Sequence, residues 1–335
     1  MAKVKDPTFK FIDLFAGVGG IRLGFQAAGG ECVFSSEWDA FAQRTYAENF
    51  GHVPHGDITK IAASEIPSFD VLAAGFPCQP FSSIGRREGF DHPTQGTLFY
   101  DVLRIVKHHK PRAFLLENVA GLTTHDRGKT MRVIEESLLE LGYDLWHRVL
   151  DAADYGVPQH RDRIYIVGLR VKGRRRPPAV FAASELDCNL WSEGDHARRF
   201  EFPKPVRKAI GIGQFLESGV TGHSVSTHLQ KVYLFKADDG RPEIVDRNSD
   251  FPVKTLVASY HKIQRLTGTF VRDGETGIRL LTASECKAIM GFPKTFKIPV
   301  SRTQMYRQMG NSVAVPVVKA IARRIAEALG AEGSS

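Results

Sequence analysis

Apolar runs of strand length alternate with amphipathic stretches of helical length over about the first 170 residues of the chain. The strand-like runs lie at 9–15, 31–36, 56–58, 70–75, 113–116, 145–150 and 163–168. The stretches with helical spacing lie at about 20–28, 39–50, 98–109 and 130–141. Strands that alternate with helices form a mostly parallel, doubly wound sheet, so we predict an α/β fold for this part of the chain.

The regular alternation ends after Gly168. A basic segment that ends in two prolines, at 172–178, is typical of a solvated linker. From there to about Leu280 the periodicity is poor, and only short pieces at 252–259 and 268–272 resemble strands. We therefore predict a second, smaller, loop-rich domain that contains some β structure.

Helical spacing returns near the C-terminus, at 280–290 and 313–329. We expect residues 308–312 to lie at the start of the last helix, where Asn311 or Ser312 can cap it. The predicted division of the chain is a first domain at 1–180 and 311–335, the smaller domain at 200–280, and a hinge segment at 281–310.

Glycines and acidic residues follow several of the predicted strands. A glycine-rich turn at 16–20 opens the first helix, Glu37 lies 20 residues after Gly17, and Glu117 follows a later strand. In doubly wound sheets, ligands bind beyond the carboxyl ends of the strands, so these residues converge on one crevice. A glycine turn exposes backbone N–H groups, and an acid at this offset reaches a ribose hydroxyl, which predicts a nucleoside-containing cofactor. The alternatives are a tight turn without a ligand and, for Asp57, a helix cap.

Cys78 lies directly after the strand-like run at 70–75, between Pro77 and Pro80. Proline restricts its own backbone and that of the residue before it, so this loop is stiff. Most free cysteines are small buried hydrophobes, but a position on a stiff loop past a strand end argues for a nucleophile.

Composition narrows the class of protein. The chain has 335 residues, of which 42% are hydrophobic and 24% are charged, as in an ordinary globular protein. It has neither an apolar run that can span a bilayer nor a secretory signal, so we expect a cytoplasmic protein. Its four cysteines lie far apart, which argues against a disulfide framework and against a metal site. The net charge of +8 suits a polyanionic partner.

Five sequence blocks together resemble the cytosine-C5 DNA methyltransferases of bacterial restriction-modification systems. They are 13–20 (DLFAGVGG), 77–79 (PCQ), 117–119 (ENV), 159–163 (QHRDR) and 308–313 (QMGNSV). The blocks have the order and spacing of that family and span almost the whole chain. The resemblance implies a Rossmann-like methyltransferase domain that uses S-adenosylmethionine, and a target-recognition domain at 200–280 that reads duplex DNA.

The same resemblance implies a set of cofactor-binding residues. They are Phe15, Ala16, Gly17, Val18, Gly20, Glu37, Trp38, Asp57, Ile58, Gly75, Pro77, Leu98, Asn311, Ser312 and Val313. Within this set, the family pattern assigns the ribose hydroxyls to Glu37 and the adenine amine to Asp57. Trp38 and Ile58 are expected to pack against the adenine ring.

The resemblance also implies a catalytic mechanism. A Cys78 thiolate attacks C6 of a cytosine that has been flipped out of the duplex, and C5 then takes the methyl group. Protonated Glu117 donates to N3, a role that predicts a raised carboxyl pKa. Arg163 contacts the cytosine carbonyl, and an exposed, alternating strand start is the alternative for both Arg161 and Arg163. The remaining catalytic candidates are Arg161, Gln159 and Asn118.

DNA contacts are expected in two stretches. The candidates are Ser82, Arg86 and Arg87 after the cysteine, and Ser259, Tyr260, His261, Lys262, Gln264, Arg265 and Thr267 in the smaller domain. Arginine and glutamine can read base edges, and phosphate contacts are the alternative for the basic residues. The second stretch resembles enzymes that act on short CCGG-type palindromes. A monomer on DNA and a cognate restriction endonuclease for the same site, without a stable complex, are implied as well.

Two other functions stay open at this point. One is a tRNA cytosine-C5 methyltransferase of the same fold. The long variable region between the two catalytic halves argues against it, because such a region suits the groove of a duplex. The other is a DNA-binding relative without catalysis. The presence of all three proposed catalytic side chains, Cys78, Glu117 and Arg163, argues against it.

Overall fold

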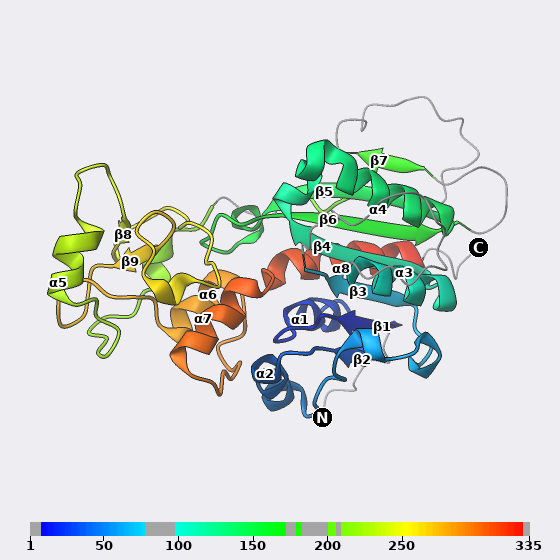
Figure 1. The fold of residues 1–335 in the computed structure, drawn as a ribbon, viewed down its shortest axis with the longest axis horizontal. Coiled ribbons are helices and arrows are strands. Elements are labelled where there is room, and N and C mark those ends of the chain that lie inside the picture. The colour runs from blue at the N-terminus through cyan, green and yellow to red at the C-terminus, as the bar shows by residue number, and fades with distance from the viewer. Residues whose placement is uncertain (1–7, 78–97, 172–178, 183–199, 206–208, 331–335) are drawn as a thin grey trace.

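The computed structural model describes residues 8–77, 98–171, 179–182, 200–205 and 209–330. Two parts of the chain lie side by side along the long axis of the molecule (Figure 1). One part is built on a large sheet, and the other contains short strands and helices from the second half of the chain.

A sheet of seven strands forms the first part, in the order β2-β1-β3-β4-β6-β5-β7. The strands are β1 (Phe9–Leu14), β2 (Gly30–Ser36), β3 (Val71–Gly75), β4 (Ala113–Val119), β5 (Tyr143–Asp151), β6 (Asp162–Arg170) and β7 (Val180–Ala182). The strands β2, β1, β3 and β4 are parallel, whereas β6 runs antiparallel to both β4 and β5. The predicted α/β, doubly wound fold class is confirmed, with one reversed strand.

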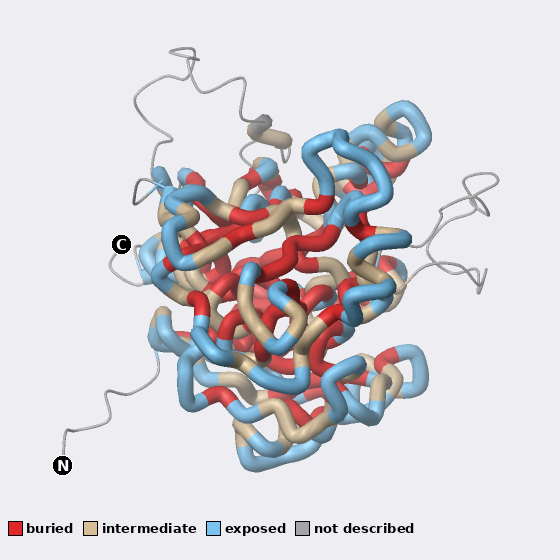
Figure 2. Tube along the Cα trace, turned by 90° about the vertical axis from the view of Figure 1, so that its left-hand side faces the viewer, coloured by how far each residue is buried: buried red, intermediate tan, exposed pale blue. Residues whose placement is uncertain are grey.

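Helices cover both faces of this sheet. The helices are α1 (Gly20–Gln26), α2 (Ala40–Phe50), α3 (Leu98–His109), α4 (Lys129–Glu140) and α8 (Val315–Gly330). Side chains alternate along β1, so that Phe11 packs in a core with α1 and α8, while Ile12 packs in a second core with α3 and α4. Figure 2 shows that the buried residues gather at the centre of the molecule and that exposed segments surround them.

The second part has its own core, which includes Val271, Met290 and Tyr306. Its elements are α5 (Thr227–Leu229), β8 (Glu243–Val245), β9 (Thr269–Val271), α6 (Ala283–Met290) and α7 (Arg302–Asn311). The guanidinium of Arg279 is fully buried and pairs with Glu285 at 2.8 Å. Because an arginine can donate five hydrogen bonds in a fixed plane, this one residue holds several loops of a part with little regular structure.

Three sequence predictions about secondary structure were wrong. The expected strand at 56–58 is a single β-bridge between Ser36 and His55, followed by the 3-10 turn Ile58–Lys60. Residues 252–259 contain only one bridge, between Gln159 and Val253, instead of a strand. Residues 308–311 form the last turn of α7 rather than the start of the final helix, because Ser312 ends one helix before α8 begins.

Candidate active site

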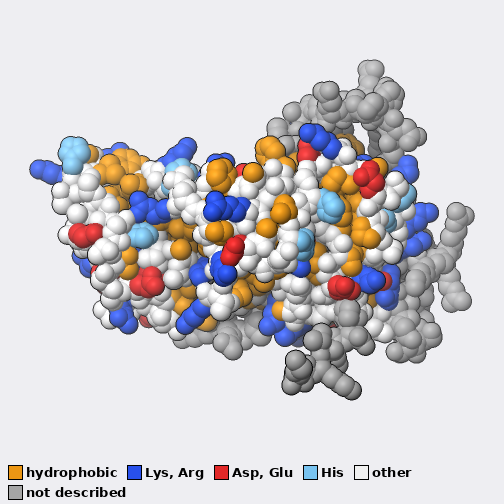
Figure 3. Space-filling model, turned by 90° about the horizontal axis from the view of Figure 1, so that it is seen from below, with side chains coloured by type: hydrophobic (Ala, Val, Ile, Leu, Met, Phe, Trp, Pro, Cys, Tyr) orange, Lys and Arg blue, Asp and Glu red, His pale blue; other side chains and the backbone are white. Residues whose placement is uncertain are grey.

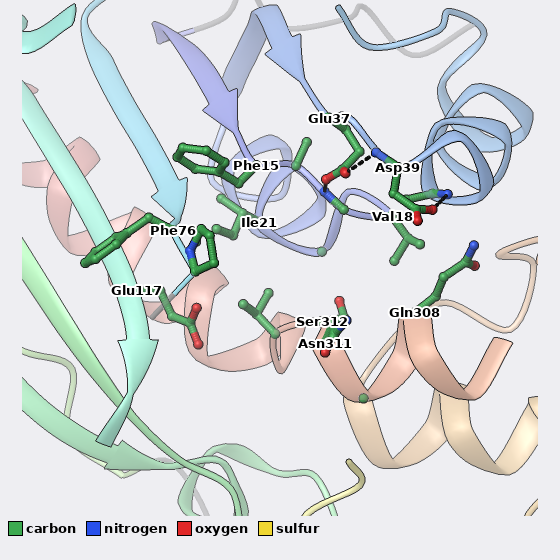
Figure 4. Close-up of a pocket in the computed structure, with 18 of the residues that line it drawn as sticks. Phe15, Val18, Ile21, Glu37, Asp39, Phe76, Glu117, Gln308, Asn311 and Ser312 are labelled. Carbon is green, nitrogen blue, oxygen red and sulfur yellow. Dashed lines mark hydrogen bonds between the residues drawn. The ribbon is translucent and has the colours of Figure 1, made fainter. Parts of the chain in front are cut away.

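A cavity of about 480 Å³ lies beyond the carboxyl ends of the parallel strands β1 to β4. Phe15 follows β1, Glu37 follows β2, and Phe76 follows β3, and all three line it. Because β6 is reversed, its first residues, including Arg163, reach the same edge of the sheet. The junction between α7 and α8 closes the cavity from the opposite side (Figure 4).

Glu37 is a buried carboxylate that two backbone N–H groups hold in place. Its Oε2 accepts from the N–H of Gly17 at 2.8 Å, and its Oε1 accepts from the N–H of Asp39 at 2.8 Å (Figure 4). Burial raises the pKa of Glu37, and these two hydrogen bonds act in the opposite direction. Gly17 has a φ of 54° and open space where a Cβ would point, so a ligand can approach the backbone there. The result is a fixed acceptor for hydroxyl donors beside an open glycine turn.

The predicted adenine-binding residues divide into two groups. Trp38 lines the cavity and is 78% exposed, so one face of its ring is available for stacking. Asp57 and Ile58 are not among the lining residues. Asp57 instead accepts from the N–H of Thr59 at 3.0 Å and caps the turn that follows, while Ile58 packs in the core. In this structure Asp57 is therefore the N-terminal cap of a 3-10 turn, which was the alternative to adenine binding.

Glu117 and Arg163 form a mostly buried ion pair, with 3.2 Å between Oε1 and Nε. Burial raises the pKa of Glu117, whereas the positive charges of Arg163 and Arg161 lower it. A Cβ at Gly75 would lie 3.3 Å from Oε2 of Glu117, so the glycine leaves room for this carboxyl. Glu117 can therefore hold a proton, and Arg163 can donate a hydrogen bond, at the same point of the cavity wall.

The loop that carries Cys78 begins in the wall of the cavity. Pro77 lines the cavity, and Cys78 itself lies outside the described residues, as do Ser82, Arg86 and Arg87. The side-chain amide of Asn118 donates to the carbonyl of Phe76 at 2.9 Å. This hydrogen bond fixes the backbone just before the loop.

Arg161 and Gln159 lie beside the cavity and connect it to the second part of the molecule. Arg161 lines the cavity, is 2% exposed, and donates to backbone carbonyls. Gln159, a catalytic candidate expected to support Arg163, does not line the cavity. Its amide donates to the carbonyl of Ile289 at 2.9 Å and accepts from the N–H of Leu256 at 2.7 Å.

Two of the predicted DNA-contacting residues are part of the protein interior. Tyr260 is 2% exposed, and its hydroxyl donates to the carbonyl of Thr269. Arg265 is 4% exposed, and its guanidinium donates to the carbonyl of Leu234 at 2.8 Å and to Asp239 at 2.8 Å. Because both side chains are buried and hydrogen-bonded within the protein, neither is free to reach DNA in this structure.

The other residues of that stretch are at least partly exposed. The hydroxyls of Ser259 and Thr267 both donate to Oε1 of Gln264, at 3.1 and 2.9 Å. His261 has its Nδ1 3.2 Å from the carbonyl of Ala258. The side chain of Lys262 is exposed.

Several lining residues were not predicted from the sequence. They are Ile21, Asp39, Ala42, Phe76, Val119, Gln304, Arg307, Gln308 and Gly310. Gln304, Arg307 and Gln308 lie three and four positions apart, which is the spacing of one helix face. This helical spacing could have predicted α7 as a separate helix from the sequence alone.

The described residues contain no group of three or more His, Cys, Asp or Glu side chains that could hold a metal ion. In the same residues, no helix has both the length and the apolar character needed to cross a membrane.

Residues 9–327 match the family model of C-5 cytosine-specific DNA methylases. The chain is 59% identical over 321 residues to the Type II methyltransferase M.MspI of a Moraxella species, covering 96% of this chain and 71% of that protein. It is 56% identical over 321 residues to the Type II methyltransferase M.BsuFI of Bacillus subtilis, covering 95% and 73%. A solved structure of the Dnmt2 methyltransferase of S. pombe has the same fold, with a TM-score of 0.71, 20% identity, and coverage of 96% of this chain and 98% of that one.

Proposed function

Because the chain belongs to the family of C-5 cytosine-specific DNA methylases, we propose that it transfers a methyl group from S-adenosylmethionine to C5 of cytosine in a short, specific duplex DNA sequence. One observation carries this proposal. A single cavity is lined by a hydroxyl acceptor, Glu37, and by the buried pair of Glu117 and Arg163. The first suits a nucleoside cofactor, and the second suits a pyrimidine ring.

The residues around the glycine turn fit this cofactor. Glu37 accepts hydrogen bonds from the ribose hydroxyls, and Trp38 stacks on the adenine. The space beside the backbone of Gly17 accommodates the methionine part. Ser312 and Val313 close the cavity on the far side. S-adenosylmethionine, when bound, supplies an electrophilic methyl group on its sulfonium.

Cys78 is the proposed nucleophile, by the sequence pattern around it. Its thiolate forms a bond to C6 of the cytosine while the ring electrons shift toward C5 and N3. Glu117 donates its proton to N3, and Arg163 donates to the ring carbonyl, so the developing negative charge is neutralised. After C5 takes the methyl group, a water molecule accepts the C5 proton, N3 returns its proton to Glu117, and expulsion of the thiolate restores the aromatic ring.

A cytosine inside a duplex cannot present C6 to a cavity wall, so the target base must be flipped out of the helix. We assign the reading of the DNA sequence to residues 200–280. The remaining candidates for contacts in the described part of this stretch are Ser259, His261, Lys262, Gln264 and Thr267. The proposed target is a short palindrome of the CCGG type. By analogy with its Type II relatives, the protein acts in a restriction-modification system with a nuclease for the same site.

The proposal is tested by incubating the purified protein with plasmid DNA and S-adenosylmethionine and mapping 5-methylcytosine by bisulfite sequencing. We expect methylation at one short sequence. Methyl incorporation into bulk tRNA alone would replace this function by the tRNA alternative, and incorporation into neither would favour a DNA-binding relative without catalysis.

Cys78→Ser tests the nucleophile separately. The variant should lose turnover, because a serine hydroxyl is a much weaker nucleophile than a thiolate, and should still bind S-adenosylmethionine. Cys32→Ser is the matched control, since Cys32 is a free cysteine on β2 outside the cavity, and it should keep its activity. Retained turnover in Cys78→Ser would refute the assignment.

A further inference from the structure

Residues 253–258 of the second part are joined to the start of β6 by a series of hydrogen bonds. The N–H of His160 donates to the carbonyl of Val253 at 2.8 Å, and the hydroxyl of Thr255 donates to the carbonyl of His160 at 2.6 Å. The N–H of Leu256 donates to the side chain of Gln159 at 2.7 Å. This segment therefore follows the edge of the sheet at which the cavity lies.

Arg161 connects the same segment to the cavity wall. Its Nη1 donates to the carbonyl of Leu256 at 3.0 Å. Its Nη2 donates to the carbonyls of Gly310 at 2.9 Å and Ser312 at 2.5 Å, and both of these residues line the cavity. One planar guanidinium thus joins the segment 253–258 to the junction between α7 and α8.

A direct backbone contact supports this connection. A Cβ at Gly310 would lie 2.2 Å from the N of Ala258 and 2.3 Å from the carbonyl carbon of Val257. The helix α7 and the segment 253–258 are therefore packed against each other without intervening side chains. The segment therefore contacts Gly310 directly, and Arg161 adds hydrogen bonds that extend the connection to Ser312.

We propose that Arg161 is a positioning residue that couples the reading of the DNA sequence to the binding of the cofactor. The segment that it holds leads directly into residues 259–267, where the remaining candidates for DNA contacts lie. A duplex that fits these residues sets the position of the Leu256 carbonyl, and Arg161 transmits that position to Gly310 and Ser312. The inference rests on the proposed function, because it needs DNA and S-adenosylmethionine as the two ligands.

The coupling is measurable as a ratio of dissociation constants. The affinity for S-adenosylhomocysteine is measured by calorimetry without DNA, with a duplex that contains the mapped target, and with a duplex changed at one base pair. For the unmodified protein, we expect the target duplex to tighten binding about 5- to 150-fold, the usual range of coupling between two sites. The changed duplex should tighten it less.

Arg161→Lys keeps the positive charge but loses the planar fork that reaches three carbonyls. We expect its ratio to fall toward one, with a smaller change in the affinity measured without DNA. Thr255→Val removes one hydrogen bond of the same segment without touching the cavity, and it should lower the ratio in part. Arg324→Lys is the matched control, since Arg324 lies on α8, outside the cavity, and donates to the carbonyl of Glu201 at 3.2 Å.

An unchanged ratio in Arg161→Lys, or a ratio of one in the unmodified protein, would overturn the coupling. A loss of affinity that is equal with and without DNA would also overturn it, because Arg161 would then be only a part of the pocket. If Arg161→Lys does not fold, the ratio of Thr255→Val decides. Failure of the proposed function would be seen separately, as an absence of methylation when the target is mapped.

Discussion

Burial and two neighbouring cations act in opposite directions on the carboxyl of Glu117. Burial raises its pKa, and the charges of Arg163 and Arg161 lower it. In the proposed role the carboxyl must hold a proton to donate to N3 of the base. The rate of methyl transfer should therefore fall as the pH rises through the pKa of Glu117, since the proton is lost there.

Glu117→Gln should slow methyl transfer by a factor of about ten to ten thousand, the usual range for loss of a general acid. It should also remove the part of the pH dependence that Glu117 causes, because an amide does not titrate. The measurement is the single-turnover rate against pH, with the exposed Glu31→Gln as a control that keeps the original profile. An unchanged rate would remove Glu117 from the chemistry.

Asp13 is a second buried carboxyl, in β1. Neither of its oxygens has a hydrogen-bond partner among the described residues, and burial raises its pKa from 3.8 to about 8. The folded state then keeps this proton to higher pH than the unfolded state. Its contribution to the free energy of unfolding is complete below about pH 4 and is lost as the pH rises toward 8.

Asp13→Asn should therefore reduce the loss of stability between pH 5 and pH 8, a window that lies within this range. Urea unfolding at both pH values measures the difference for each variant. The same substitution at the exposed Asp126 should leave the difference as it is in the unmodified protein. The interpretation of Asp13 fails if both variants behave alike.

At the level of elements, local sequence patterns predicted most strands and helices but not their directions or long-range contacts. The helix α3 occupies the predicted residues, because its apolar spacing is regular over its whole length. The reversal of β6 was not predictable, since a strand carries the same alternation in either direction. Tyr260 and Arg265 read as surface residues because their partners, such as Asp239, lie elsewhere in the sequence.

The same limit applies to the site. Residues next to strand ends, such as Glu37 and Glu117, were predicted from local sequence, and the cavity lies where the rule for doubly wound sheets expects it. Arg307 and Gln304 were missed, because no helix was predicted between 291 and 307 and only 308–312 were placed at the start of the last helix. The hydrogen bonds of Arg161 join three distant segments, which no local pattern encodes.

Gly310→Ala should destabilise the protein by about 1–3 kcal/mol, the usual range for overpacking, because its Cβ would overlap the backbone of Val257 and Ala258. Rotation of a side chain cannot relieve a clash with backbone atoms. The measurement is the midpoint of thermal unfolding. Gly330→Ala is the control, since no atom lies within 4 Å of its Cβ position, and it should not lower the midpoint. A midpoint for Gly310→Ala equal to that of the control would contradict the packing argument.

At the level of the whole molecule, the net charge is +8, but the face shown in Figure 3 has no single large basic patch. Basic and acidic side chains are mixed across that face. If DNA binds on this face, it should contact individual basic residues there rather than one broad basic surface.

Affinity for duplex DNA should fall steeply with salt concentration, because each neutralised phosphate releases counterions. Lys262→Ala should reduce the slope of log affinity against log salt by about one and weaken binding to all sequences alike. Lys129→Ala, on α4 and outside the cavity, should keep the slope. A flat salt profile, or equal slopes in the two variants, would speak against Lys262 as a phosphate contact.

The reversed direction of β6 also determines where additional residues can be inserted into the chain. Asp162 pairs with Asp151 at the end of the sheet where the cavity lies, and Arg170 pairs with Tyr143 at the opposite end. Polypeptide inserted after Arg170 therefore leaves the sheet on its far side. Its cost is mainly the entropy of closing a longer loop, which increases only slowly with length. A longer loop or a fusion partner attached there would therefore start at the end of the sheet away from the cavity.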